Sequence, residues 1–192
     1  MQIQWLGLGA FKIQTTQATI ITDPFTDTKQ LALPKFKAEL VLVSDTGNPQ
    51  ANNVKRLSGE PFVVTGPGEY EIHDVFVYGV PAEHTVYVIE VEGMNVAFLG
   101  TGKTAITTKQ LESIEGADIL LLPLDNFSKE QRTTLISEIE PRIIVPYLYN
   151  AETLAAFLKE MGVKNAEAKD KLVVKAKDLP NEDTMIELLK PN

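Results

Sequence analysis

The counts of histidine and cysteine set the first limit on the chemistry of this chain. The sequence of 192 residues contains no cysteine and two histidines, His73 and His84. Disulfide frameworks, thiolate-bound zinc, iron–sulfur clusters and thiol nucleophiles are therefore excluded. Two imidazoles cannot form a metal centre that needs three. His84 follows an expected strand and is interpreted as a structural hydrogen-bonding residue, while His73 falls in an expected solvated turn.

A glycine-rich segment, Ala97–Thr104, matches a relaxed Walker A motif in which alanine replaces the first glycine. In such a motif backbone amides hold phosphates, Lys103 would contact the β- and γ-phosphate oxygens, and Thr104 would bind magnesium. Asp125 follows an apolar segment and would be the matching Walker B carboxylate. Nucleotide binding through Gly102-Lys103-Thr104 is therefore one hypothesis, although a strand that ends in a glycine-rich turn is the favoured interpretation.

Asp45-Thr46-Gly47, which follows the apolar segment Leu40–Val43, matches the active-site loop of aspartic proteases. That chemistry needs two carboxylates that share a proton. The sequence contains no second Asp-Thr-Gly or Asp-Ser-Gly, so only a symmetric dimer could supply the partner. A polar turn at the end of a strand is the favoured interpretation.

Short apolar and alternating segments predict that the first hundred residues are mainly strands. The expected strands are Ile3–Leu8, Ala10–Gln14, Ala18–Thr22, Leu40–Ser44, Pro61–Thr65, Val75–Val80, Val86–Glu92 and Asn95–Leu99. Gly66-Pro67-Gly68 is interpreted as a turn. Further strands are expected at Ile143–Val145, Leu172–Val174 and Met185–Leu189, and short helices at Val54–Leu57 and Lys109–Ile114.

Capping residues mark the expected helix starts in the second half of the chain. Thr107 with Gln110 and Ser128 with Gln131 have the spacing of capping boxes, and Asn150 is a good N-cap. The first of these pairs places a helix start beyond the glycine-rich segment, which does not favour a phosphate-binding loop. The pattern predicts a mixed α/β fold, with residues 1–192 forming a single domain.

Charge and hydropathy limit the partners and the compartment. The net charge is −8 and the isoelectric point is about 4.8, which disfavours binding to nucleic acid or to anionic membranes. We find neither a membrane-spanning apolar run nor the basic start of a signal peptide, so we expect a cytoplasmic protein. The expected partner is a small molecule or another protein.

Five segments, in order, resemble the metallo-β-lactamase fold superfamily, and within it the small bacterial branch akin to the UlaG-like hydrolases. They are Ile3–Gly7 with Ala10–Ile13, Ile20–Pro24, Leu40–Ser44, Gly66–Ile72 and Glu140–Pro146. This resemblance implies a four-layer αββα sandwich with metal ions at the strand ends between two sheets. It also implies hydrolysis by a metal-activated water, with zinc as the usual metal.

The chain departs from the ligand motifs that the resemblance implies. Where the family has His-x-His-x-Asp-His after the strand that ends at Ser44, this sequence reads Asp45-Thr46-Gly47-Asn48-Pro49-Gln50. Thr101 stands at the position of a bridging aspartate, and Leu148 at that of a final histidine. Only His84 falls where such proteins keep a histidine. These substitutions predict that no zinc or other metal cofactor is held.

We therefore expect a metal-free, catalytically degenerate member of this fold that acts as a binding, scaffold or regulatory module. Its vestigial cleft would contain Asp23, Asp45, Gln50, His84, Thr101 and Leu148. An alternative is a metal-dependent phosphodiesterase or esterase with a relocated oxygen-ligand site. That site would bind Mg²⁺ or Mn²⁺ through Asp23, Asp45, Asp118 or Asp125.

Overall fold

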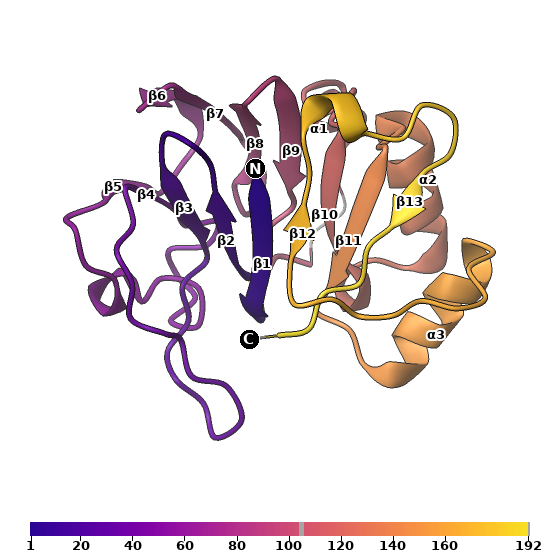
Figure 1. Ribbon diagram of the computed structural model, residues 1–192, viewed down its shortest axis with the longest axis horizontal. Coiled ribbons are helices and arrows are strands. Elements are labelled where there is room, and N and C mark those ends of the chain that lie inside the picture. The colour runs from indigo at the N-terminus through magenta and orange to yellow at the C-terminus, as the bar shows by residue number, and fades with distance from the viewer. Residues whose placement is uncertain (104–105, 192) are drawn as a thin grey trace.

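Two β-sheets face each other across the core of the computed structural model, which describes residues 1–103 and 106–191 (Figure 1). The six-stranded sheet has the order β12-β1-β2-β3-β4-β5 and the seven-stranded sheet the order β13-β11-β10-β9-β8-β7-β6. The first sheet contains β1 (Gln2–Gly7), β2 (Ala10–Gln14), β3 (Thr19–Thr22), β4 (Leu40–Leu42), β5 (Phe62–Val64) and β12 (Leu172–Val173). The second contains β6 (Gly68–Ile72), β7 (Val75–Val80), β8 (Val86–Val91), β9 (Met94–Phe98), β10 (Ile119–Pro123), β11 (Ile143–Tyr147) and β13 (Met185–Ile186).

Each sheet is antiparallel in one part and parallel in the other. Strands β1 to β3 and β6 to β9 form antiparallel ladders. In contrast, β3, β4 and β5 are parallel to one another, as are β9, β10, β11 and β13. Since the carboxyl ends of parallel strands share one edge of a sheet, the loops after β3, β4, β9, β10 and β11 gather their polar residues at such an edge.

The main core lies between the sheets and is formed by alternate, inward-facing residues along the strands of both sheets. Aromatic side chains fill its end nearest the strand carboxyl termini. The ring of Phe11 meets that of Tyr147 edge-on at 5.1 Å between centroids, and Phe98 stacks on Tyr147 at 6.0 Å. These fully buried rings form the part of the core next to the loops that follow β9 and β11.

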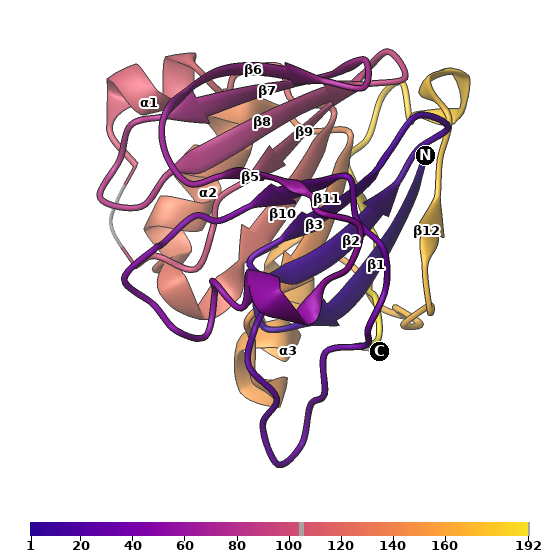
Figure 2. The same ribbon diagram turned by 90° about the vertical axis from the view of Figure 1, so that its left-hand side faces the viewer.

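Helices cover the outer face of the seven-stranded sheet (Figure 1). They are α1 (Thr108–Glu112), α2 (Lys129–Ile139) and α3 (Ala151–Glu160). The outer face of the other sheet is covered by residues 25–39 and a 3-10 turn, η1 (Val54–Arg56), both of which lie in front of that sheet in Figure 2. Two further 3-10 turns are η2 (Leu124–Asn126) and η3 (Ala176–Asp178). The expected αββα order is confirmed, with an irregular fourth layer.

The predicted helix starts are confirmed in detail. Thr107 and Ser128 each form a capping box with the glutamine three residues later, and the Asn150 side chain accepts hydrogen bonds from two backbone amides of α3. Strand β6 was not predicted: Gly68, expected in a turn, begins this strand and pairs with Gly79. Its alternating glutamates face solvent at a sheet edge, so it lacks the apolar pattern of a central strand.

Two other predictions were too long or of the wrong kind. The segment expected as a helix at Val54–Leu57 is a 3-10 turn, and the strand expected at Met185–Leu189 ends at Ile186. Beyond Ile186 an isolated bridge joins Lys169 and Leu189. No helix of the described residues has the length and apolarity to cross a membrane.

Candidate functional site

The loops that follow β4, β9 and β10 are joined by hydrogen bonds at one edge of the sandwich. The amide of Thr85, just before β8, donates to the carbonyl of Ser44 over 2.9 Å. The amide of Thr101 donates to Ser44 Oγ at 3.4 Å. Asn126 Nδ2 in turn donates to the carbonyl oxygens of Thr101 and Gly102, at 2.9 and 2.8 Å. Strand ends of both sheets therefore form one connected polar region.

Asp23 lies at the centre of this region and is completely buried. Its carboxylate accepts a hydrogen bond from the Ser44 amide at 2.7 Å and another from Ser44 Oγ at 2.6 Å. Burial raises the pKa of Asp23 to about 7, although the two hydrogen bonds from Ser44 act in the opposite direction. The φ angle of Asp23 is 34°, a left-handed conformation that few non-glycine residues adopt. Asp23 thus ties the end of β3 to the loop after β4.

Asp45 and His84 form the second polar pair of the site. His84 Nδ1 lies 3.3 Å from Asp45 Oδ2, and Asp45 Oδ1 accepts a hydrogen bond from the amide of Gly47. Asp45-Thr46-Gly47 is therefore the polar turn that the sequence favoured over a protease loop. The imidazole packs directly on Gly102, where an added Cβ atom would lie 1.8 Å from His84 Cδ2. The ring is held between a carboxylate and a glycine.

The remaining predicted residues do not join this pair. Thr101 is nearby, but its hydroxyl is buried and has no hydrogen-bond partner within the described part of the chain. Gln50 is exposed, and its backbone amide donates to Asn48 Oδ1 in a local turn. Leu148 is half-buried with a φ of 47°, and its carbonyl accepts a hydrogen bond from the Asp125 amide.

Two buried tyrosines support the site and were missed in the sequence. The Tyr87 hydroxyl donates to the carbonyl of Val43 at 2.8 Å, and the Tyr147 hydroxyl donates to the carbonyl of Gly100. Burial raises the pKa of both phenols above the ordinary value, so each remains a proton donor. Their positions in apolar strands made them look like ordinary core residues, and only the hydroxyl distinguishes them from phenylalanine.

The donor set at this edge does not fit the zinc centre that the resemblance implies. A zinc site in a protein needs at least three protein ligands, supplied by Cys, His, Asp or Glu. In the described part of this edge Asp45 and His84 form a pair, whereas the Asp23 carboxylate accepts two hydrogen bonds from Ser44. Within residues 1–103 and 106–191, no group of three or more such side chains has the arrangement to hold a metal ion.

The four carboxylates of the relocated oxygen-ligand site likewise form no metal-binding group within the described residues. Asp118 precedes β10 and Asp125 follows it, so the five residues of this strand separate them by about 16 Å. The Asp118 carboxylate accepts a hydrogen bond from the Asn95 amide and lies 3.7 Å from the guanidinium of Arg142. Asp118 therefore belongs to the opposite edge of the sheet from Asp23 and Asp45.

The glycine-rich segment does not open a helix at Lys103. Helix α1 begins at Thr108, after the capping box, and has only five residues. Lys103 is exposed, and Thr104, the proposed magnesium ligand, lies outside the described residues. The geometry of a Walker A loop, in which the lysine belongs to the first turn of a helix, is therefore not formed by the described part of the segment.

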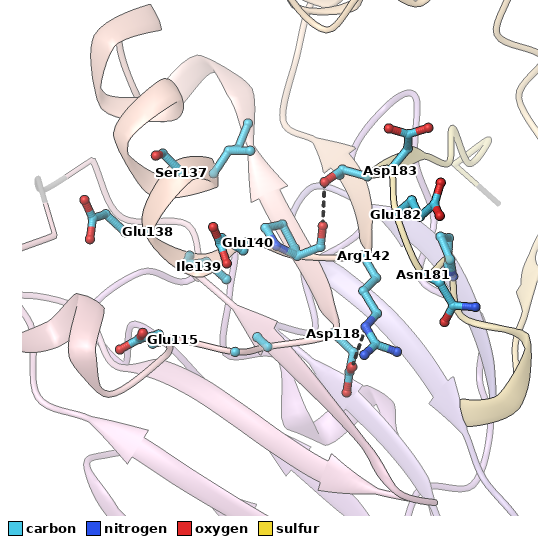
Figure 3. A pocket seen from close by; sticks show the side chains of 16 residues that line it. Glu115, Asp118, Ser137, Glu138, Ile139, Glu140, Arg142, Asn181, Glu182 and Asp183 are labelled. Carbon is cyan, nitrogen blue, oxygen red and sulfur yellow. Dashed lines mark hydrogen bonds and ion pairs between the residues drawn. The ribbon is translucent and has the colours of Figure 1, made fainter.

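Three of the hollows on the described surface differ greatly in volume. Around His84 and Gly102 the free volume is only about 10 Å³. A pocket of about 340 Å³ opens beside it, between the β1–β2 turn and the loops after β10 and β11. The largest of these three, about 870 Å³, lies at the opposite edge, where Glu115, Glu138, Glu140 and Asp183 line the pocket together with the Asp118–Arg142 pair (Figure 3). Of the predicted residues, His84 and Gly102 line the smallest hollow, Lys103, Asp125 and Leu148 line the pocket of about 340 Å³, and Asp118 lines the acidic one.

The sequence and the fold are similar to those of known proteins. The sequence model of the beta-lactamase superfamily domain matches residues 2–148. A proposed Zn-dependent hydrolase of the metallo-beta-lactamase superfamily from Thermotoga maritima is 25% identical, with a TM-score of 0.81 over 99% of this chain and 100% of the other. Igni18, a metallo hydrolase from Ignicoccus hospitalis, is 16% identical, with a TM-score of 0.65 over 91% of this chain and 99% of the other.

An isothiocyanate hydrolase from Delia radicum gut bacteria shares the fold at 12% identity, with a TM-score of 0.64 over 92% of this chain and 100% of the other. No curated protein matches the sequence. The two more distant structures show the same fold, and the sequence match extends from β1 to the residue after β11. From the match over residues 2–148, the chain belongs to the beta-lactamase superfamily.

Proposed function

We propose that this chain is a metal-free, catalytically degenerate member of the UlaG-like branch of the superfamily, with residues 1–192 as one domain. It would act as a binding or regulatory module and not as a hydrolase. The observation that carries the proposal is the Asp45–His84 pair, which brings together only two of the side-chain types that bind zinc. An Asp and a His hold a transition metal weakly, because affinity depends on the number and geometry of the ligands.

The surroundings of His84 support the same proposal. Nδ1 of the imidazole faces Asp45, and its other side faces Gly102 in a hollow of about 10 Å³. A hollow of this size has room for about one water molecule. A hydrolytic centre needs space for a metal ion, the attacking water and a substrate together. The free volume lies in the neighbouring pocket, which suits binding better than hydrolysis.

Metal content measured on the purified full-length chain tests the proposal. We expect less than about 0.1 zinc, iron or manganese per chain by elemental analysis, because three ligands are the minimum for a stable zinc site. Adding each metal at equimolar concentration should shift the thermal midpoint equally in the wild type and in the His84→Ala variant. One or two tightly bound metal ions per chain, lost in His84→Ala, would overturn the proposal.

A hydrolase assay tests the competing function. With Mn²⁺ or Mg²⁺ present, bis-p-nitrophenyl phosphate and p-nitrophenyl acetate should be hydrolysed no faster than with buffer and metal alone. Metal-dependent turnover that disappears in Asp45→Ala would establish the relocated oxygen-ligand site in place of a degenerate one. Asp178→Ala is the matched control, because Asp178 is exposed in η3, away from the candidate site.

A further inference from the structure

The pocket of about 340 Å³ has an apolar floor and a charged rim. Aromatic and leucine side chains form the floor: Trp5, Leu8, Leu31, Leu148 and Tyr149. The ring centroids of Trp5 and Tyr149 lie 5.5 Å apart, with 43° between the ring planes, so the two rings are in contact. Lys103, Asp125 and Asn126 contribute the polar side chains, and Pro191, near the C-terminal end of the chain, also lines the pocket. An apolar pocket with a few convergent polar groups is the usual form of a small-molecule site.

Two leucines of the floor, Leu8 and Leu148, have a strained backbone conformation. Leu8 and Leu148 have φ angles of 48° and 47°, in the left-handed region that costs an L-residue about 1–2 kcal/mol. The other non-glycine residues with positive φ in the described chain are Asp, Glu or His. The Leu8 carbonyl accepts a hydrogen bond from Trp5 Nε1 at 2.9 Å, and the Leu148 carbonyl accepts one from the Asp125 amide at 2.9 Å. Backbone strain of this kind is concentrated at binding sites.

Backbone hydrogen bonds also fix the positions of the two charged residues of the rim, Lys103 and Asp125. The backbone amide of Asp125 donates a hydrogen bond to the Leu148 carbonyl. Lys103 directly follows Thr101 and Gly102, whose carbonyl oxygens accept hydrogen bonds from Asn126 Nδ2. Both side chains are exposed, and neither takes part in an ion pair within the described residues. The pocket thus offers one cation and one anion next to an apolar floor.

We infer that this pocket binds a small zwitterion with an apolar side chain, of the size and chemistry of a hydrophobic α-amino acid. Its carboxylate faces Lys103, its ammonium group faces Asp125, and its side chain lies against Trp5 and the leucines. A volume of about 340 Å³ is at the lower end for ligand sites, which suits this class and is small for a nucleotide. The inference rests on the proposed function, since it gives the binding module a class of ligand.

Calorimetry and thermal shift on the full-length chain test this with three probes of the same shape. L-phenylalanine carries both charges, 3-phenylpropanoate only the carboxylate, and phenethylamine only the ammonium group. We expect L-phenylalanine to bind more tightly than either singly charged probe. Lys103→Gln and Asp125→Asn should each weaken binding by about two- to fivefold, the effect of one exposed ion pair. Lys164→Gln, at an exposed site elsewhere, is the matched control and should change nothing.

Glycine substitutions separate the binding role of the leucines from a structural one. Leu148→Gly removes part of the floor but relieves the left-handed strain, so binding should weaken about tenfold with little loss of thermal stability. Glu140→Gly relieves the same strain outside this pocket, where φ is 50°, and should leave binding unchanged.

Equal binding of the three probes, or binding of none, would overturn the inference. So would L-phenylalanine binding that is unaffected by Lys103→Gln, Asp125→Asn and Leu148→Gly. These outcomes are independent of the metal content, so a failure of this inference is distinguishable from a failure of the proposed function.

Discussion

Nδ1 of His84 lies 3.3 Å from Oδ2 of Asp45, and the opposite side of the imidazole ring rests on Gly102. Asp45 follows β4 of the six-stranded sheet, and His84 precedes β8 of the seven-stranded sheet. The two residues are 39 positions apart in the sequence. In this chain the pair connects two turns, and its contribution to stability can be measured.

A double-mutant cycle should give a small coupling for this pair. Both side chains are about one quarter exposed, so solvent screens their attraction. We expect His84→Ala and Asp45→Asn to couple by less than about 1 kcal/mol in urea unfolding. EDTA should leave the unfolding midpoint of the wild type unchanged. A larger coupling that EDTA removes would contradict this expectation, because it would show that a metal ion bridges the two residues.

Gly102→Ala should destabilise the protein through a clash with His84. The added Cβ would lie 1.8 Å from Cδ2 and 2.6 Å from Cγ of the ring, so the whole imidazole must move. We expect a loss of about 1–3 kcal/mol in the free energy of unfolding. Combining Gly102→Ala with His84→Ala should recover most of that loss. Gly116→Ala is a poor control because φ is positive there, whereas Gly66→Ala, with no neighbouring atom within 4 Å, is a suitable one.

If the double variant is no more stable than Gly102→Ala alone, the cause of the destabilisation lies in the backbone of the loop and not in the ring. That result would contradict the packing of His84 on Gly102. The measurement therefore tests a contact between residues 18 positions apart, which no local pattern in the sequence predicts.

Local features of the fold could be predicted because their physical causes are local. A side chain that caps a helix acts on amides two or three residues away, so Thr107, Ser128 and Asn150 were identified correctly. Apolar alternation likewise predicted most strands. Strand β6 escaped because its exposed glutamates carry no such pattern, and its pairing with β7 depends on a hairpin turn at His73 and Asp74 with positive φ.

The candidate site was predictable only in part because its contacts are long-range. The sequence pointed to Asp23, Asp45 and His84, yet Ser44 as the partner of Asp23 emerges only when β3 and β4 are paired. Gln50 was expected at the cleft and faces solvent, since its turn bends away after Asn48. Leu148 was predicted at the cleft, but its pocket partner Leu8 was not, because the left-handed conformation of these two leucines has no signature in residue type.

The stability of the protein should fall as the pH rises from 4 to 8 because of Asp23. Burial raises its pKa from 3.8 to about 7, and the nearby charge of Asp45 acts in the same direction. Between these two values the folded state keeps a proton that the unfolded state has lost, so folding is favoured at the acidic end. Above about pH 7 the buried carboxyl ionises as well and this advantage is gone. A separation of about three pKa units corresponds to about 4 kcal/mol over the whole range.

The difference between the wild type and Asp23→Asn isolates this contribution, because the other titrating groups are common to both. Asparagine keeps an acceptor for the Ser44 amide but cannot ionise. Urea unfolding from pH 4 to pH 8 should therefore show the wild type losing about 4 kcal/mol relative to Asp23→Asn. Asp74→Asn, in the exposed hairpin, should run parallel to the wild type. If the stability of Asp23→Asn also ran parallel to that of the wild type across this pH range, the Asp23 carboxyl would have the same pKa in the folded and unfolded states. In that case the two hydrogen bonds from Ser44 would offset the cost of burying its charge.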